Sequence, residues 1–144
     1  MPHIQKSALV PYSCQQMYEL IDQIEAYPDF IPWCKKAEVV TRNTHEVQAT
    51  LSLAQAGMEK SFTTRNRLDP YSSIDLNLID GPFEKLQGHW RFIPEQEGCR
   101  VSLDLEFKFA SSLMGMLFSS AFNQAANTLV ELFIERAKVV YGVL

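Results

Sequence analysis

The sequence predicts an α+β fold in which a seven-stranded curved antiparallel sheet wraps around a long C-terminal helix. Between residues 36 and 109, apolar and polar residues alternate with a period of two, and turn residues interrupt the runs. From 112 to about 141, apolar residues instead recur at helical spacing. The 144 residues, with 47% hydrophobic and 21% charged side chains, suit a single globular domain covering 1–144.

The N-terminal part is expected to form a strand, a helix and a packed loop. The strand covers residues 3–10 and ends at a proline. Ser13 and Gln16 form a capping-box pattern, which predicts a helix from there to about residue 24. In the segment 27–34, two prolines exclude a regular helix or a central strand, yet four large apolar side chains need burial.

A meander of six strands should follow. The expected strands are 36–42, 45–54, 58–68, 73–79, 83–93 and 99–109. In the last of them, odd-numbered residues from 101 are apolar and even-numbered ones are polar, so one face of the sheet is wet and the other is covered. Only the C-terminal helix, about 45 Å long, can provide the cover. Its apolar positions are Leu113, Leu117, Ala121, Ala125, Leu129, Leu132, Phe133 and Val140.

A twisted sheet that curls around one helix leaves space between them, and this predicts a cavity. The candidate lining residues are Phe62, Leu76, Leu78, Leu86, Trp90, Leu105 and Phe107 from strands, with Phe118, Phe122 and Leu129 from the helix. The alternative is that all of them form a solid core.

The order of elements, the apolar C-terminal helix and the segment Tyr-Pro-Asp-Phe-Ile-Pro-Trp-Cys at 27–34 resemble the START-like family of coenzyme Q-binding proteins. The likeness covers nearly the whole chain. It implies a helix-grip fold with an apolar tunnel, and non-catalytic binding of ubiquinone or a related isoprenoid lipid in support of respiratory electron transport. It also implies a second role, since bacterial members are named as ribosome association toxins, which bind the large ribosomal subunit and hinder association of the two subunits.

The same resemblance assigns site residues in the proline-containing segment. Tyr27, Phe30 and Trp33 match the family's segment and would line or gate the tunnel mouth, with the flat Trp33 indole stacking on a quinone ring. The alternative is a packed loop that only plugs the fold.

Surface cations are candidates for ribosome contact. They are Lys35, Lys36, Arg65 and Arg67. The two arginines share the wet face of their strand, and Lys85 and Arg91 could extend them into a patch for ribosomal RNA. Asp75, on the intervening strand, would partly cancel this patch, and the alternative is an ordinary solvated strand face.

The start of the C-terminal helix carries an apolar cluster, Leu113 to Phe118, that is too dense for one buried stripe. We expect part of it to face a membrane surface or a partner, as an adaptable apolar lid. A broad core stripe is the alternative.

Composition restricts the remaining classes. A net charge of -4 and a pI near 5.3 argue against a DNA-binding protein. Neither an export signal nor an apolar stretch long enough to span a bilayer is visible, so we expect a cytoplasmic protein with at most peripheral contact to the inner membrane. Three widely spaced cysteines, Cys14, Cys34 and Cys99, predict neither a disulfide framework nor a zinc site. Cys34 is either a reactive thiol or a buried, inert one.

Enzymatic chemistry has little support in the sequence. His3, His45 and His89 lack ligand spacing, so no metal or other cofactor is expected. Neither a G-x-S-x-G elbow nor a phosphate-binding glycine loop is present. A cyclase or aromatase type of enzyme, as found in the wider superfamily, is the enzymatic alternative, and His89 on the wet face is poorly placed as its base.

Overall fold

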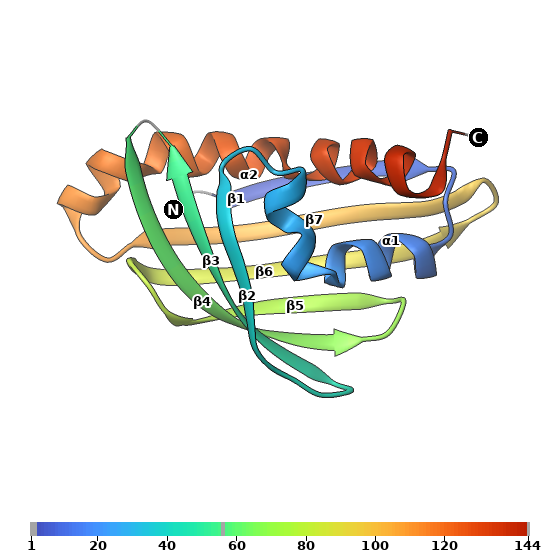
Figure 1. Ribbon diagram of the computed structural model, residues 1–144, viewed down its shortest axis with the longest axis horizontal. Coiled ribbons are helices and arrows are strands. Elements are labelled where there is room, and N and C mark those ends of the chain that lie inside the picture. Colours follow the sequence, from blue (N-terminus) through green and yellow to red (C-terminus); the bar gives the residue numbers. More distant parts are fainter. Residues whose placement is uncertain (1–2, 56, 144) are drawn as a thin grey trace.

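The computed structural model describes residues 3–55 and 57–143, which form one sheet, two α-helices and one short 3-10 helix (Figure 1). The elements in order are β1 (His3–Val10), α1 (Cys14–Asp22), η1 (Ile24–Asp29), β2 (Cys34–Arg42), β3 (Glu46–Gln55), β4 (Met58–Asp69), β5 (Ser73–Asp80), β6 (Phe83–Glu95), β7 (Gly98–Phe109) and α2 (Ser112–Tyr141). The predicted α+β helix-grip architecture is confirmed, and each strand limit lies within two residues of its expected place.

The seven strands form a single antiparallel sheet in the order β1-β7-β6-β5-β4-β3-β2. The meander therefore runs from β7 to β2, and β1 joins it beside β7. Strand β7 alternates between buried and partly exposed residues along most of its length, as the period of two predicts. The inward face packs against both helices, and Figure 1 shows α2 lying along β1 and β7 while the β3–β4 hairpin crosses near its N-terminal half.

Helix α1 starts with the predicted capping box. The Ser13 hydroxyl accepts from the Gln16 backbone N–H at 3.0 Å, and the Gln16 side chain accepts from the Ser13 N–H at 2.9 Å. The helix ends at Asp22, two residues earlier than predicted, and continues into η1 with Pro28 inside. The tighter 3-10 turn accommodates this proline over a few residues, so the segment is a short helix followed by a packed loop.

Helix α2 has the predicted limits, but only part of the predicted apolar stripe is buried. Its buried residues are Ala125, Ala126, Val130, Phe133 and Ala137. Leu113, Leu117 and Val140, which we expected to cover the sheet, are exposed instead. Helical spacing at these positions does not imply burial, because neither the sheet nor α1 covers their side chains. Among the described residues, no helix is long and apolar enough to cross a membrane.

The expectation of no disulfide is wrong for one pair. Cys14 at the start of α1 and Cys99 at the start of β7 form a disulfide, with their Cα atoms 5.1 Å apart. The antiparallel pairing of β1 with β7 sets Val10 opposite Cys99, and the short turn into α1 then returns Cys14 to the same place. A separation of 85 residues in the chain conceals this proximity.

Candidate functional site

A cavity of about 100 Å³ lies between the inward face of the sheet and the two helices. This is room for several water molecules, so it exceeds an ordinary packing defect. Its walls come from α1, η1, the following loop, strands β3 to β7 and α2. The lining residues are Ile21, Asp22, Ile24, Tyr27, Ile31, Trp33, Ala49, Leu51, Leu53, Phe62, Thr64, Asn66, Ile74, Leu76, Leu86, Trp90, Leu103, Leu105, Phe122, Ala125, Ala126 and Leu129.

A second hollow of about 50 Å³ continues from the first toward the N-terminal half of α2. The two share Trp33, Leu53, Phe62, Phe122 and Ala125. Phe118, Lys60 and Phe109 line its outer part, and the Lys60 ammonium lies 5.8 Å from the Phe118 ring centroid. Together the two hollows form a slot that runs from α1 to the apolar start of α2.

Most of the residues predicted to line a cavity are brought together here. Those that line the larger hollow are Tyr27, Trp33, Phe62, Leu76, Leu86, Trp90, Leu105, Phe122 and Leu129. Phe118 lines only the smaller hollow.

Phe30, Leu78 and Phe107, which were also predicted to lie in the cavity wall, line neither of these two hollows. Phe30 packs on Phe133 at 5.5 Å between ring centroids, beneath the Arg136 guanidinium. Phe107 is completely buried against Phe122, at 4.6 Å, and belongs to the solid core. Leu78 lies near the end of β5, paired with Thr64 directly before the register shift between Thr63 and Thr64. Inward alternation alone does not distinguish cavity wall from filled core.

Tyr27 and Trp33 differ in how their polar atoms are used. The Tyr27 hydroxyl donates to the Ile21 carbonyl, and burial raises the pKa of this phenol. The Trp33 Nε1–H is buried and has no hydrogen-bond partner among the described residues. Since Trp33 borders both hollows, its indole lies at the middle of the slot rather than only at its mouth.

A polar group at the α1 end of the cavity was missed in the sequence. Thr64 and Asn66 are buried on β4, and the Thr64 hydroxyl donates to the Asn66 amide oxygen at 2.7 Å. Asp22, the last residue of α1, accepts from Arg42 Nη1 at 2.9 Å through Oδ2, while Oδ1 is buried without a partner among the described residues. The alternation Phe62, Thr64, Asn66, Leu68 along one strand could have revealed the first pair; no local signal points to Asp22.

Cys34 matches the inert alternative. Its side chain is buried, and its thiol donates to the Lys36 carbonyl at 3.4 Å. Burial raises the pKa of the Cys34 thiol to about 11, so it is protonated and unreactive at neutral pH.

Comparison with known proteins identifies the family. The family model described as "Polyketide cyclase / dehydrase and lipid transport" matches residues 10–134. The chain belongs to the polyketide cyclase/dehydrase and lipid transport family.

Named relatives and solved structures agree with this assignment. The chain is 42% identical over 143 residues to the ribosome association toxin RatA of Escherichia coli K12, covering 99% of this chain and 90% of the relative. It is 27% identical over 139 residues to the mitochondrial coenzyme Q-binding protein coq10 of Schizosaccharomyces pombe, covering 92% and 85%.

Among solved structures, the 18 kDa protein CC1736 of Caulobacter crescentus matches with a TM-score of 0.77, 31% identity and coverage of 99% and 100%. A START superfamily protein of Mycobacterium smegmatis shares the fold, with a TM-score of 0.74, 20% identity and coverage of 96% and 98%.

On the solvent-exposed face of the sheet, acidic residues lie beside most of the predicted cations. Arg65 Nε lies 3.5 Å from Glu46, and Lys35 Nζ lies 3.4 Å from Glu59. Asp75 pairs with Arg91 at 2.8 Å, as its place between the strands predicted. Mixed charge therefore replaces an unbroken basic patch.

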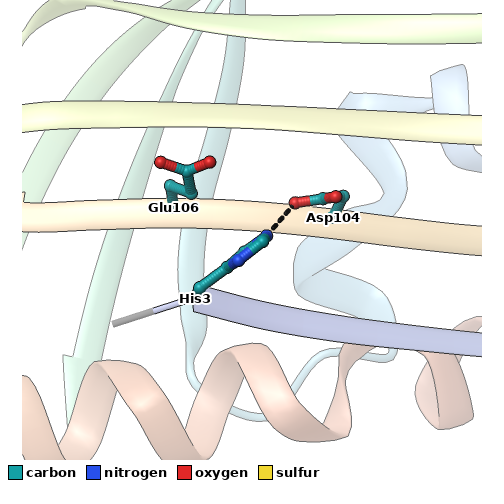
Figure 2. A group of neighbouring side chains, drawn as sticks. All are labelled: His3, Asp104 and Glu106. Carbon is teal, nitrogen blue, oxygen red and sulfur yellow. Dashed lines mark hydrogen bonds and ion pairs between the residues drawn. The ribbon is translucent and has the colours of Figure 1, made fainter. Parts of the chain in front are cut away.

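One histidine on this face lies beside two carboxylates (Figure 2). His3 on β1 binds Asp104 on β7, and Glu106 extends beside them, with one ligand atom from each within 4.8 Å of the others. The Glu106 carboxylate also binds Lys85 Nζ at 3.0 Å. Because both carboxylates already have protein partners and the group is exposed, we assign it no metal.

Part of the apolar cluster at the start of α2 is exposed to solvent, as the density of apolar residues there predicted. Leu113, Met116 and Leu117 are exposed by 63%, 83% and 48%, whereas Phe118 is half-buried over the smaller hollow. The exposed part lies next to the open end of the slot.

Proposed function

We propose that this protein binds a hydrophobic isoprenoid ligand, a polyprenyl quinone of the ubiquinone type, in the cavity between sheet and α2, and performs no chemistry on it. The observation that carries the proposal is the pair of adjoining, almost wholly apolar hollows, which share five lining residues and are walled by aromatic side chains. Similarity to a relative named for coenzyme Q binding supports the choice of ligand. In this function the protein supports respiratory electron transport.

The size of the slot suggests how such a ligand would be held. The larger hollow is small for a drug-sized ligand, whose pockets are usually about 300–1,000 Å³. An apolar cavity of about 150 Å³ accommodates benzene, so the quinone ring enters the larger hollow by displacing side chains that line it, and the tail leaves through the smaller hollow along the exposed apolar start of α2.

The lining argues for binding rather than catalysis. Among the described residues of the larger hollow, the ionisable side chains are those of Asp22 and Tyr27. The Ile21 carbonyl holds the Tyr27 hydroxyl, and Arg42 holds Oδ2 of Asp22, which leaves Oδ1 of Asp22 as a hydrogen-bond acceptor. No second ionisable side chain among the described residues of this lining is placed to complete a pair for acid–base catalysis.

Ligand extraction tests this function. Protein purified under mild conditions is extracted with organic solvent, and the extract is analysed by mass spectrometry. We expect a polyprenyl quinone with the native protein and much less with Ala126→Leu, which places a larger side chain in the cavity wall. A lipid-free extract from the native protein, together with no uptake of added quinone, refutes the proposal.

A second candidate function is binding to the large ribosomal subunit, which hinders association of the two subunits. It is favoured by the 42% identity, over nearly the whole chain, to a relative named as a ribosome association toxin. Arg65 and Arg67 are exposed on the wet face of β4, opposite the cavity, so this role can be separated from lipid binding.

Sedimentation of ribosomal subunits tests it. Replacing both Arg65 and Arg67 by Gln should weaken association with the subunit and reduce its dependence on salt, because phosphate contacts are lost. The control is Arg91→Gln, since Asp75 holds that guanidinium at 2.8 Å, more closely than Glu46 holds Arg65 at 3.5 Å. Unchanged sedimentation of the double variant excludes these arginines as the contact.

A further inference from the structure

The two ends of the slot differ in polarity, and this difference bears on how a quinone is oriented. In the sheet register, Asn66 on β4 pairs with Val47 on β3, and Val47 pairs with Arg42 on β2. Arg42 in turn donates to Asp22 through two bonds, at 2.9 Å to Oδ2 and 3.0 Å to the backbone carbonyl. Asp22 and Asn66 therefore lie at the same end of the cavity.

At this end, one carboxylate oxygen lacks a hydrogen bond. Asp22 lines the cavity, and its Oδ1 is buried without a partner among the described residues, although Oδ2 is well bound. Leaving such an acceptor unpaired is costly, and native structures usually supply a partner. Burial raises the pKa of this carboxyl, while Arg42 opposes the shift, which is consistent with a partly desolvated group.

The chemistry of the free oxygen distinguishes the two redox forms of a quinone. A carboxylate oxygen accepts a strong, charge-assisted hydrogen bond from a ring hydroxyl. A quinone carbonyl is itself an acceptor, so it would face this oxygen without a proton between them. Sites built to bind a hydroxyl reject analogues that lack it.

We propose that the α1 end of the cavity is a head-group subsite in which Asp22 Oδ1 accepts a hydrogen bond from a ring hydroxyl, so that the protein prefers the reduced quinol to the oxidised quinone. The inference rests on the proposed quinone-binding function and extends it to ligand orientation and redox form. The isoprenoid tail then runs past Phe62 and Phe122 toward the start of α2.

Calorimetric titration of lipid-stripped protein tests this subsite. The three probes are a ubiquinone with two isoprene units, the corresponding quinol and the dimethyl ether of that quinol. The quinol is extracted after reduction and kept under nitrogen. We expect the quinol to bind at least about tenfold more tightly than the quinone, as one charge-assisted bond allows. The ether, whose oxygens cannot donate, should bind no more tightly than the quinone.

Variants locate the effect. Asp22→Asn can keep an oxygen toward Arg42 and turn its N–H groups into the cavity, so the preference should disappear or reverse in favour of the quinone. Glu25→Gln, which removes an exposed carboxylate nearby on η1, should leave the preference unchanged.

The possible failures are distinguishable. Binding of both redox forms with equal affinity, or an ether that binds like the quinol, overturns the subsite while lipid binding stands, and requires no variant to fold. A preference for the quinone over the quinol that is lost in Trp33→Phe also overturns the subsite, and places a ring carbonyl at the indole N–H, which can only donate. If neither form binds the native protein, the proposed function fails together with this inference.

Discussion

Replacing Ala126 by leucine should both stabilise the protein and block its cavity. Ala126 is 4% exposed on α2 and lines the larger hollow, so the added carbons enter empty space. Three carbons at about 0.8 kcal/mol each give roughly 2.4 kcal/mol. Fixing the leucine rotamer costs about 0.5–1 kcal/mol, which leaves a gain of roughly 1.5 kcal/mol in the free energy of unfolding.

A second alanine on the same helix provides the control. Ala137 is 0% exposed and lines neither hollow, so Ala137→Leu should overpack the core and cost about 1–3 kcal/mol. Denaturant unfolding of the ligand-free proteins measures both changes, and quinone titration measures the block. If Ala126→Leu is destabilised like Ala137→Leu and still binds quinone with native affinity, the hollow is not a ligand cavity.

Three further predictions concern Trp33, the disulfide and Asp22. Trp33→Ala should weaken quinone binding at least about tenfold but reduce the free energy of unfolding by less than the roughly 3–5 kcal/mol typical of a core aromatic, because the indole is half-buried beside empty space. Titration measures the affinity and thermal melts measure the stability. A stability loss of about 3–5 kcal/mol with native affinity contradicts this prediction. The Cys14–Cys99 disulfide closes a separation of 85 residues, so its reduction should lower the free energy of unfolding by up to about 4–5 kcal/mol. Denaturant unfolding with and without reductant measures this difference, and equal stabilities would refute the prediction. Burial raises the folded-state pKa of Asp22, so the contribution of its protonated carboxyl to the free energy of unfolding is fully present below the ordinary carboxyl pKa and is lost as pH rises through the raised value. Asp22→Asn should therefore gain stability relative to the native protein over that rise. Unfolding free energies across a pH series measure this, and a constant difference between the two proteins argues against it.

The strand pattern could be predicted from the sequence because each strand has one wet and one covered face. Strand limits came within two residues, and the limits of α2 agreed. Along α2, however, Leu117 and Ala125 belong to the same predicted apolar stripe, and only Ala125 is buried. Periodicity reports which residues share a face, but how far the opposing surface extends depends on tertiary packing.

The site was harder to predict than the fold for two physical reasons. Phe107 and Leu105 share the inward face of β7, yet the first is in solid core and the second borders the cavity, since Phe122 from α2 fills the space against Phe107. Asn66 and Asp22 meet at one end of the cavity only through the pairing of three strands and the Arg42 bridge. Such long-range register leaves no local pattern in the sequence.

The uneven burial of α2 has a kinetic consequence. Its buried residues all lie from Ala125 onward, whereas the preceding turns cover the smaller hollow with half-buried and exposed side chains. Lifting only the turns that precede Phe122 breaks the contact of Phe118 with Phe109, but leaves Phe122 packed on Phe107 and the Asp22–Arg42 bridge in place. A ligand bound as proposed can therefore exchange by local opening, at a rate set by a small part of the molecule and independent of the global unfolding equilibrium.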